Sequence, residues 1–267
     1  MNNTLEYMRE NRLPHIWCPG CGNGTVIGAL IRAIDALGLD TNKTVLVSGI
    51  GCSSRAPGYM KFDALHTTHG RALPFATGIK MANPELNVIV ISGDGDAAAI
   101  GGNHLIHACR RNIDITMVII NNNVYGMTSG QYSPLTPTGR LATTAVYGNI
   151  DRTFDLPSLC GAAGATYVAR ASVYHVAQLK NYIQKGLENK GFSMIEAVSI
   201  CPTYFGRRNK LGDAPAMFNW IKENSTMYKQ GVMEYDKQIV IGEFVNKKDP
   251  EYTKSYTELI EKLGGNK

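Results

Sequence analysis

The chain has 267 residues, of which 44% are hydrophobic and 18% charged, enough for one sizeable α/β domain with its own core. A net charge of +5 is too small to indicate nucleic-acid binding, but it suits an acidic protein partner or a solvated surface. Met1–Arg12 is polar, and no apolar stretch reaches membrane-spanning length. We therefore expect a soluble, cytoplasmic protein without a signal peptide or membrane span. Six cysteines in such a protein favour metal or redox use over disulfides.

Apolar runs alternate with helical patterns along the chain, as is typical of a parallel α/β sheet. In chain order the sequence predicts a helix at Gly24–Leu37, strand Thr44–Ser48, helix Leu73–Ala82, strand Asn87–Ser92, helix Ala97–Arg111, strands Ile115–Ile120 and Tyr167–Arg170, helix Val173–Asn189 and strand Ser193–Ser199. The stretch from Thr128 to Asn149 is rich in Pro, Gly, Ser and Thr and is too long for a simple connector, so we expect a functional loop. Residues 1–210 are predicted to form a single domain with a mostly parallel sheet flanked by helices. Residues 211–267 are predicted to be a C-terminal tail that wraps a neighbour or packs on the surface.

The predicted strand Asn87–Ser92 runs directly into Gly93-Asp94-Gly95-Asp96. The spacing of Gly93, Gly95 and Ala98 also fits a dinucleotide-binding loop. However, the carboxylate of Asp94 would repel a bare pyrophosphate, and the next strand ends in Asn121-Asn122-Asn123, with no acid to hold a ribose. A metal ion between the carboxylate and a diphosphate removes the first objection.

Mg²⁺ takes carboxylate, amide and phosphate oxygens as ligands. A right-handed crossover would bring the carboxyl ends of the two strands together, so Asp94 and Asn122 would share one Mg²⁺ that carries a diphosphate. The N-terminus of the following helix would add backbone N–H groups. Gly-Asp-Gly followed by Asn-Asn resembles the signature of thiamine-diphosphate enzymes. By that resemblance Asp94, Asn122 and the main-chain carbonyl of Val124 are Mg²⁺ ligands; the alternative is an ordinary tight turn between strand and helix.

Four of the six cysteines lie in motifs that suit metal binding. Cys18 and Cys21 form a Cys-x-x-Cys pair, Cys52 follows Gly51, and Cys201 precedes a proline. Four such residues can hold zinc or a [4Fe–4S] cluster, and a Cys-x-x-Cys can also be a redox dithiol. A redox cluster beside thiamine diphosphate has an evident task, whereas structural zinc has none, and this favours the cluster. Cys109 lies inside a helical pattern and Cys160 precedes Gly161-Ala162-Ala163, so both are expected to be buried apolar fillers.

Taken together, the motifs resemble the β subunit of the 2-oxoacid:ferredoxin oxidoreductases. The matching segments are Cys18-x-x-Cys21-Gly22, Gly49-Ile50-Gly51-Cys52-Ser53, His69-Gly70-Arg71, Gly93-Asp94-Gly95-Asp96 and Tyr125-Gly126-Met127-Thr128. The resemblance runs from Trp17 to Lys210. One departure is Thr128-Ser129-Gly130-Gln131, where the family usually has Thr-Gly-Gly-Gln. Ser129 is accommodated there if the backbone keeps ordinary angles.

The resemblance implies a function and a set of site residues. Cys18, Cys21, Cys52 and Cys201 are implied to ligate a [4Fe–4S] cluster. The implied contacts to thiamine diphosphate and Mg²⁺ come from Ile50, Gly51, Cys52, Ser53, His69, Gly93, Asp94, Gly95, Asp96, Asn122, Val124, Gly126, Met127 and Thr128. The implied reaction is oxidative decarboxylation of a 2-oxoacid to its acyl-CoA and CO₂, with electrons passing through the cluster to ferredoxin.

Such an enzyme needs partners, because thiamine enzymes build the active site between two α/β domains. This chain has room for one domain and shows only the diphosphate half. By the resemblance, an α subunit supplies the aminopyrimidine side and an activating Glu, and γ and ferredoxin-like subunits are further possible partners. The isolated chain is therefore predicted to be catalytically incomplete.

Three further features have weaker signals. His69 is predicted to face cofactor or substrate as a polar stabiliser or proton donor, although it would equally satisfy local backbone groups. Arg55 is a candidate for a bidentate contact with a substrate carboxylate, or it forms a surface ion pair. Arg207, Arg208 and Lys210 form a basic patch soon after Cys201, either a solvated face or a docking surface for an acidic ferredoxin.

The substrate is expected to be 2-oxoglutarate, because Arg110-Arg111-Asn112-Ile113-Asp114, Gln131-Tyr132-Ser133-Pro134 and the segment from Cys201 to Arg208 look most like that branch of the family. Pyruvate or another 2-oxoacid is the alternative substrate. A non-oxidative thiamine-dependent decarboxylase would share Asp94 and Asn122 but would not need four cluster ligands. A non-catalytic cysteine module would not retain thiamine diphosphate.

Overall fold

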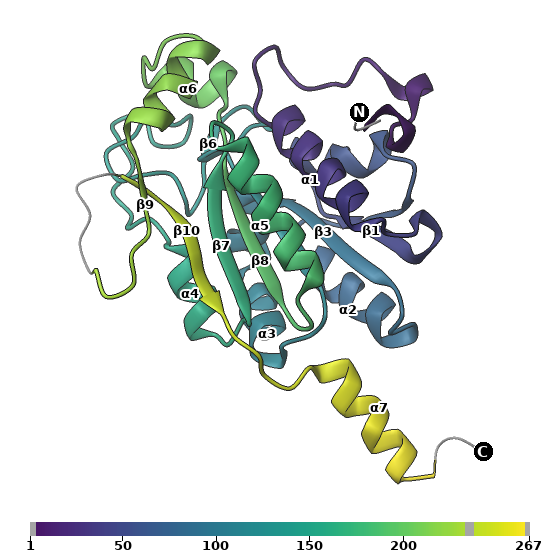
Figure 1. Cartoon of the computed structure of the whole chain (residues 1–267). Helices are drawn as coiled ribbons and strands as arrows, with labels where there is room; N and C mark the ends of the chain where they lie inside the picture. Colours follow the sequence, from purple (N-terminus) through teal and green to yellow (C-terminus); the bar gives the residue numbers. More distant parts are fainter. Residues whose placement is uncertain (1–3, 233–237, 265–267) are drawn as a thin grey trace.

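The computed structural model describes residues 4–232 and 238–264 (Figure 1). Within that part, the central sheet has eight strands in the order β2-β1-β3-β4-β8-β7-β10-β9. Their bounds are β1 Thr44–Ser48, β2 Asp63–His66, β3 Asn87–Gly93, β4 Thr116–Asn121, β7 Tyr167–Ser172, β8 Ser193–Val198, β9 Ser225–Met227 and β10 Ile239–Asn246. All neighbours pair in parallel except β10, which runs antiparallel to β7. The short strands β5 (Val124–Tyr125) and β6 (Gln131–Tyr132) form a separate antiparallel pair.

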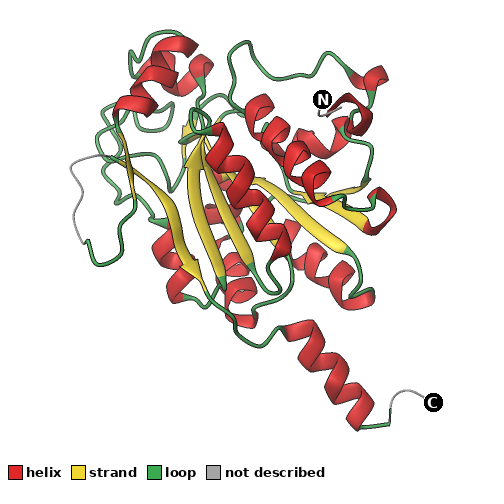
Figure 2. Cartoon of the chain, viewed as in Figure 1, coloured by secondary structure: helices red, strands yellow, loops and turns green. Residues whose placement is uncertain are grey.

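Helices cover both faces of the sheet (Figure 2). Their bounds are α1 Asn23–Leu37, α2 Ala72–Ala82, α3 Gly102–Arg111, α4 Leu156–Ala162, α5 Val176–Glu188, α6 Ala214–Glu223 and α7 Tyr252–Lys262. Helices α1 and α5 pack side by side on one face, and α2, α3 and α4 lie on the other (Figure 1). Each face has its own cluster of buried apolar side chains. The mostly parallel α/β fold expected from the sequence is therefore confirmed.

The central strands form where they do because their side chains are apolar on both faces. Every residue of β4 and β8 is buried, and so are residues 88–92 of β3. A continuous apolar run of this kind is typical of a parallel strand that helices cover on both sides. All five predicted strands and all four predicted helices are present; β1 has the predicted bounds, and each of the others is shifted at one end or both. The helix predicted to begin at Ala97 instead starts with a wide π-type turn at Asp96–Ile100, and α3 follows it.

Residues 211–232 and 238–264, the described part of the predicted C-terminal tail, are more integrated into the domain than that prediction. Strand β10 pairs with β7 and so extends the central sheet, while α6 buries Met217 and Ile221 against the core. Helix α7 alone projects away from the body of the domain (Figure 1). Four apolar side chains at helical spacing, Tyr256, Leu259, Ile260 and Leu263, are exposed along it. Among the described residues, no helix is both long and apolar enough to cross a bilayer.

Candidate functional site

The loops that follow β1, β3 and β4 meet at one edge of the sheet, because parallel strands place their carboxyl ends together. A small pocket of about 60 Å³ lies between these loops and the residues after β2. Its lining consists of Ile50, Gly51, Cys52, Ser53, His69, Gly93, Asp94, Gly95, Asp96, Asn122, Val124, Tyr125, Gly126, Met127 and Thr128. This set contains every residue that the sequence predicts to contact the cofactor. Residues from four separate segments are therefore brought to one place.

Asp94 is the buried anion of this pocket. Its side chain is 2% exposed, and burial raises the pKa of its carboxyl to about 7, although a hydrogen bond from Ser133 Oγ acts in the opposite direction. The loop that carries Asp94 has no room for side chains, since a Cβ on Gly95 would lie 2.3 Å from the ring of Tyr125. Among the described residues no cationic side chain offsets the charge of Asp94, which is the compensation that a metal ion provides.

The three consecutive asparagines have different positions. Asn122 lines the small pocket, and its Oδ1 accepts the backbone N–H of Val124 at 3.3 Å. Asn121 and Asn123 instead line a second, larger cavity. Asn123 has φ of +65°, a left-handed conformation that asparagine tolerates better than most residues, and this turns the chain between the two sides. Of the three asparagines, Asn122 is the one whose side chain is placed beside Asp94.

Asp96 and His69 meet in the same pocket. Asp96 Oδ1 lies 2.5 Å from Nδ1 of His69, and the ring of Tyr125 contacts the imidazole edge-on with centroids 5.8 Å apart. Tyr125 also donates its hydroxyl to the carbonyl of Gly95 at 3.2 Å. Burial, with the nearby charges of Asp94 and Asp96, raises the pKa of Tyr125 to about 12, so this hydroxyl stays a donor.

The four motif cysteines gather next to the pocket. A Cβ placed on Gly126 would lie 3.4 Å from Cys52 Sγ and 3.9 Å from Cys201 Sγ, so these two sulfurs flank the same glycine. The backbone N–H of Gly22 reaches the carbonyl of Ile200 at 3.4 Å, which brings the Cys-x-x-Cys segment to Cys201. The indole N–H of Trp17 donates to the carbonyl of Cys52 at 2.7 Å and ties the same segment to the Cys52 loop.

Burial and mutual repulsion disfavour charge on three of these thiols, those of Cys21, Cys52 and Cys201. Burial is the larger cause, and the neighbouring cysteines add to it, raising the pKa of Cys21 to about 12 and that of Cys52 to about 11. The pKa of Cys201 is raised for the same reasons, with Cys18 contributing. Among the described residues, no three His, Cys, Asp or Glu side chains converge as they would on a single metal ion.

Several sequence-predicted residues lie outside the pocket. Arg55 is exposed on the 3₁₀ helix Ser53–Tyr59 and is not part of the lining. The basic residues Arg207, Arg208 and Lys210 are exposed just beyond the turn that Cys201 begins. Cys109 and Cys160 are fully buried in the apolar cluster under α2, α3 and α4, and so are fillers as expected.

Three residues of the loop after β4 add to the sequence interpretation or depart from it. Ser129 has φ of +86°, in the left-handed region, so the backbone does not keep the ordinary angles under which a serine is accommodated there. Ser133, which the sequence analysis gave no role, donates to the carboxylate of Asp94. Tyr125 belongs to one of the motifs that resemble the family, but no cofactor contact is predicted for it from the sequence; in the structure it lines the pocket. Its position between Val124 and Gly126, both predicted site residues, could have predicted this. Nothing in the sequence around Ser133 predicts its contact with Asp94.

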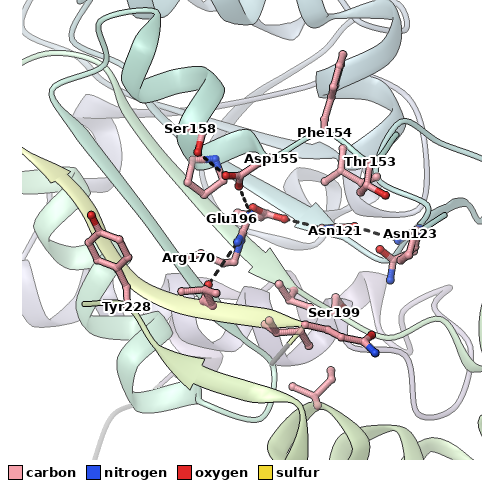
Figure 3. A pocket seen from close by; sticks show the side chains of 18 of the residues that line it. Asn121, Asn123, Thr153, Phe154, Asp155, Ser158, Arg170, Glu196, Ser199 and Tyr228 are labelled. Carbon is pink, nitrogen blue, oxygen red and sulfur yellow. Dashed lines mark hydrogen bonds and ion pairs between the residues drawn. The ribbon is translucent and has the colours of Figure 1, made fainter. Parts of the chain in front are cut away.

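The larger cavity, of about 630 Å³, lies on the other side of the asparagine turn (Figure 3). Asn121 Nδ2 donates to Glu196 at 2.8 Å, and Glu196 accepts from Arg170 Nε at 2.7 Å. Arg170 also pairs with Asp155 at 2.8 Å, as Figure 3 shows. The charges in this cavity are therefore satisfied within the chain, and the network holds Asn121, and with it the turn that carries Asn122.

Comparisons with known proteins give the same interpretation as this geometry. Residues 49–197 match the family described as "Thiamine pyrophosphate enzyme, C-terminal TPP binding domain". The chain is 53% identical to the 2-oxoglutarate synthase subunit KorB of Methanothermobacter marburgensis, over 99% of this chain and 94% of that protein. It is also 53% identical to the subunit of the same name from Methanocaldococcus jannaschii, over 98% of this chain and 99% of that protein. The chain belongs to the 2-oxoacid:ferredoxin oxidoreductase β subunits.

A solved structure supports the same assignment at the level of the fold. The 2-oxoglutarate:ferredoxin oxidoreductase from Magnetococcus marinus, with 2-oxoglutarate, coenzyme A and succinyl-CoA bound, matches with a TM-score of 0.88 and 32% identity. The match covers 98% of this chain and 90% of that one. The family resemblance predicted from the motifs is thus confirmed: the chain is a subunit of an oxidoreductase complex and carries a thiamine-diphosphate-binding domain.

Proposed function

We propose that this β subunit acts in the oxidative decarboxylation of 2-oxoglutarate to its acyl-CoA and CO₂, with electrons passing through a [4Fe–4S] cluster to ferredoxin. One observation carries the proposal. Gly126 lies between the two halves of the site: a Cβ there would be 3.7 Å from Asn122 Nδ2 and 3.4 Å from Cys52 Sγ. The pocket residue Asn122 and the thiol of Cys52 therefore lie on either side of a single glycine. The 2-oxoglutarate synthase names of the near full-length relatives support the substrate.

The residues present fit thiamine diphosphate held through Mg²⁺. Asp94, Asn122 and the carbonyl of Val124 offer carboxylate, amide and peptide oxygens, the donor set that Mg²⁺ takes in proteins. The buried carboxylate of Asp94, whose pKa is raised to about 7, gains a compensating charge when a cation binds. Thiamine diphosphate would supply the electron sink for decarboxylation. Beside Gly51 there is open space, since a Cβ there would meet no atom within 4 Å, and the hydroxyl of Ser133 donates to the carboxylate of Asp94.

The four thiols fit a multi-iron cluster. Cys52 and Cys201 flank Gly126, and hydrogen bonds to backbone carbonyls bring the segment that carries Cys18 and Cys21 to both of them. Four cysteine thiolates are the ligand set of a [4Fe–4S] cluster, and a cluster beside thiamine diphosphate has an electron-transfer task that a structural zinc ion lacks. The thiols of Cys21, Cys52 and Cys201, whose pKa values burial raises, would give up their protons when cationic iron stabilises the thiolates.

The pocket is too small to serve as a complete active site. At about 60 Å³ it is far below the several hundred Å³ of ordinary cofactor sites. This supports a half-site that an α subunit completes with the aminopyrimidine side and an activating Glu. We expect the purified chain alone, supplied with thiamine diphosphate, Mg²⁺, CoA and 2-oxoglutarate, to show no ferredoxin reduction. Full turnover by the isolated chain would overturn this half of the proposal.

The basic patch of Arg207, Arg208 and Lys210 is proposed as a docking surface for an acidic ferredoxin, because its exposed side chains follow directly after Cys201. Reversal of Arg207 and Arg208 to Glu should raise the apparent KM for ferredoxin and weaken its salt dependence. Lys248→Glu is the matched control, since Lys248 is exposed beyond the far end of β10. Equal effects of both changes would remove this patch from the docking surface.

The direct test of the reaction uses the complete complex, purified without air. Reduction of ferredoxin should require CoA and should proceed with a higher kcat/KM for 2-oxoglutarate than for pyruvate. Preference for pyruvate would change the substrate but retain the family. Release of CO₂ without electron transfer, from a complex free of iron, would instead indicate a non-oxidative thiamine-dependent decarboxylase.

A further inference from the structure

The carboxylate of Asp96 is buried and surrounded by donors from its own chain. Its side chain is 3% exposed. Oδ1 accepts the backbone N–H of Gly70 at 2.7 Å and that of Ile50 at 3.2 Å, and Oδ2 accepts from Ser92 Oγ at 2.6 Å. The remaining contact is to Nδ1 of His69, at 2.5 Å. Four hydrogen bonds therefore occupy a carboxylate that the family resemblance assigns to the cofactor.

The hydrogen bond between Asp96 and His69 determines which ring nitrogen of His69 carries the proton. Backbone N–H groups can only donate, so Asp96 Oδ1 is an acceptor, and the imidazole must donate from Nδ1. In the neutral ring the other nitrogen, Nε2, is then the acceptor. Among the described residues Nε2 has no hydrogen-bond partner of its own, and the side chain of His69, 29% exposed, lines the pocket beside Asp94 and Asn122.

The surrounding backbone leaves this arrangement little freedom. A Cβ on Gly49 would lie 2.2 Å from Asp96 Oδ2, so the chain packs directly against the carboxylate. Gly70, with φ of +69°, lets the loop after His69 turn back so that its N–H reaches Asp96. The edge-on ring of Tyr125 limits rotation of the imidazole from another direction. Asp96 thus joins the loop after β1, the His69 loop and the end of β3 at a single point.

We propose that Asp96 is a positioning residue that fixes the His69 ring with Nδ1 as donor, so that Nε2 faces the cofactor pocket as the working nitrogen. This rests on the proposed function, because it requires cofactor and substrate to occupy that pocket. Nε2 then hydrogen-bonds to, or exchanges a proton with, an oxygen of the bound 2-oxoacid. The role differs from the direct cofactor contact that the sequence resemblance implies for Asp96.

The test is a double-substitution cycle in the assembled complex with Asp96→Asn and His69→Gln. Asn keeps the size of the side chain but removes its charge, so kcat should fall about 10- to 100-fold while KM for 2-oxoglutarate and retention of thiamine diphosphate change less than about twofold. Because Asp96 acts through His69, the double variant should be no slower than His69→Gln alone. Loss of thiamine diphosphate from Asp96→Asn, or additive losses of kcat, would overturn the proposal.

A second pair of substitutions covers the case in which Asp96→Asn does not assemble. His69→Asn keeps an amide near the position of Nδ1 and can still bond to Asp96, whereas His69→Gln places an amide near Nε2. The proposal expects His69→Gln to be the more active by about tenfold or more. Greater activity of His69→Asn would mean that the contact with Asp96 is only structural. Iron and thiamine contents measured in both variants separate this result from failure of the proposed function: absence of thiamine diphosphate from the unsubstituted complex would defeat the function itself.

Discussion

Two buried carboxylates, Asp94 and Glu196, lie on either side of the asparagine turn, and only Glu196 has a cationic partner among the described residues. Asp94 and Glu196 are each 2% exposed. Glu196 has Arg170 at 2.7 Å and the amide of Asn121 at 2.8 Å, so its charge is compensated within the chain. Asp94 has the hydroxyl of Ser133 but no cation among the described residues, and its pKa is raised to about 7.

The contrast separates a structural site from a binding site. A buried charge needs a partner, and where the chain supplies that partner the result is a fixed network, as around Glu196. Where the described residues supply no such partner, as around Asp94, the buried carboxylate is available to bind a cation. By this criterion the larger cavity is not the better candidate for the chemistry, although its volume is about tenfold greater.

The largest expected effect comes from Asp94→Asn in the assembled complex. The substitution removes the charge that binds Mg²⁺, so affinity for thiamine diphosphate should fall by at least about 100-fold, more than loss of an outer partner of a metal ligand causes. The measurement is thiamine diphosphate retained after gel filtration. In the cofactor-free complex the same variant should unfold at a higher temperature, because an uncompensated buried charge is gone. Unchanged retention would contradict the role assigned to Asp94.

Glu196→Gln tests the other side of the comparison. It leaves Arg170 buried without its main partner, which should cost about 3 kcal/mol of stability. Chemical denaturation of the cofactor-free complex measures this loss. The control replaces both residues, as Arg170→Met with Glu196→Leu, and should recover part of it because no unpaired charge is left. A single variant as stable as the original protein would show that the network is not needed to hold the turn.

The pH dependence of the two sides should differ as well. Burial raises the pKa of Asp94 in the folded state to about 7, so the folded state binds its proton more tightly than the unfolded chain. Stability from this group is therefore present below the ordinary carboxyl pKa and is lost as pH rises through about 7. The affinity for thiamine diphosphate should change with pH in the opposite direction, because Mg²⁺ binds the ionised carboxylate of Asp94. This affinity should therefore increase as the pH rises through about 7. The measurements are the free energy of unfolding of the cofactor-free complex and its affinity for thiamine diphosphate, each as a function of pH. Asp94→Asn is the control and should lose both dependences.

The smallest effect concerns Ser129, beside the pocket. Its φ of +86° is strained for a residue with a Cβ, so Ser129→Gly should stabilise the protein by about 1 kcal/mol. Ser255→Gly is the matched control: Ser255 lies in α7 with helical backbone, and glycine should cost about 0.5 kcal/mol there. Thermal unfolding of the two variants should shift in opposite directions.

Much of the fold follows from local patterns in the sequence. Buried parallel strands such as β3 and β4 are mostly apolar. The Gly-Asp-Gly that begins at the end of β3 and the asparagines at the end of β4 mark the site, because the carboxyl ends of parallel strands converge. The pairing of β10 with β7 could not be predicted, because a strand at residues 239–246 joins one at residues 167–172 only through tertiary packing. The contact of Ser133 with Asp94 is also long-range. The left-handed backbone of Ser129 likewise comes from the tertiary path of the loop, not from the preference of serine.

The most direct test of the central claim is the cofactor content of the complex, purified with its natural partners and without air. Iron, zinc, acid-labile sulfide, magnesium and thiamine diphosphate should be measured for each copy of this chain. The account predicts one thiamine diphosphate with Mg²⁺, and iron and sulfide sufficient for a [4Fe–4S] cluster, which Cys201→Ser should remove while thiamine diphosphate stays. Zinc in place of iron, or a fully assembled complex without thiamine diphosphate, would contradict it.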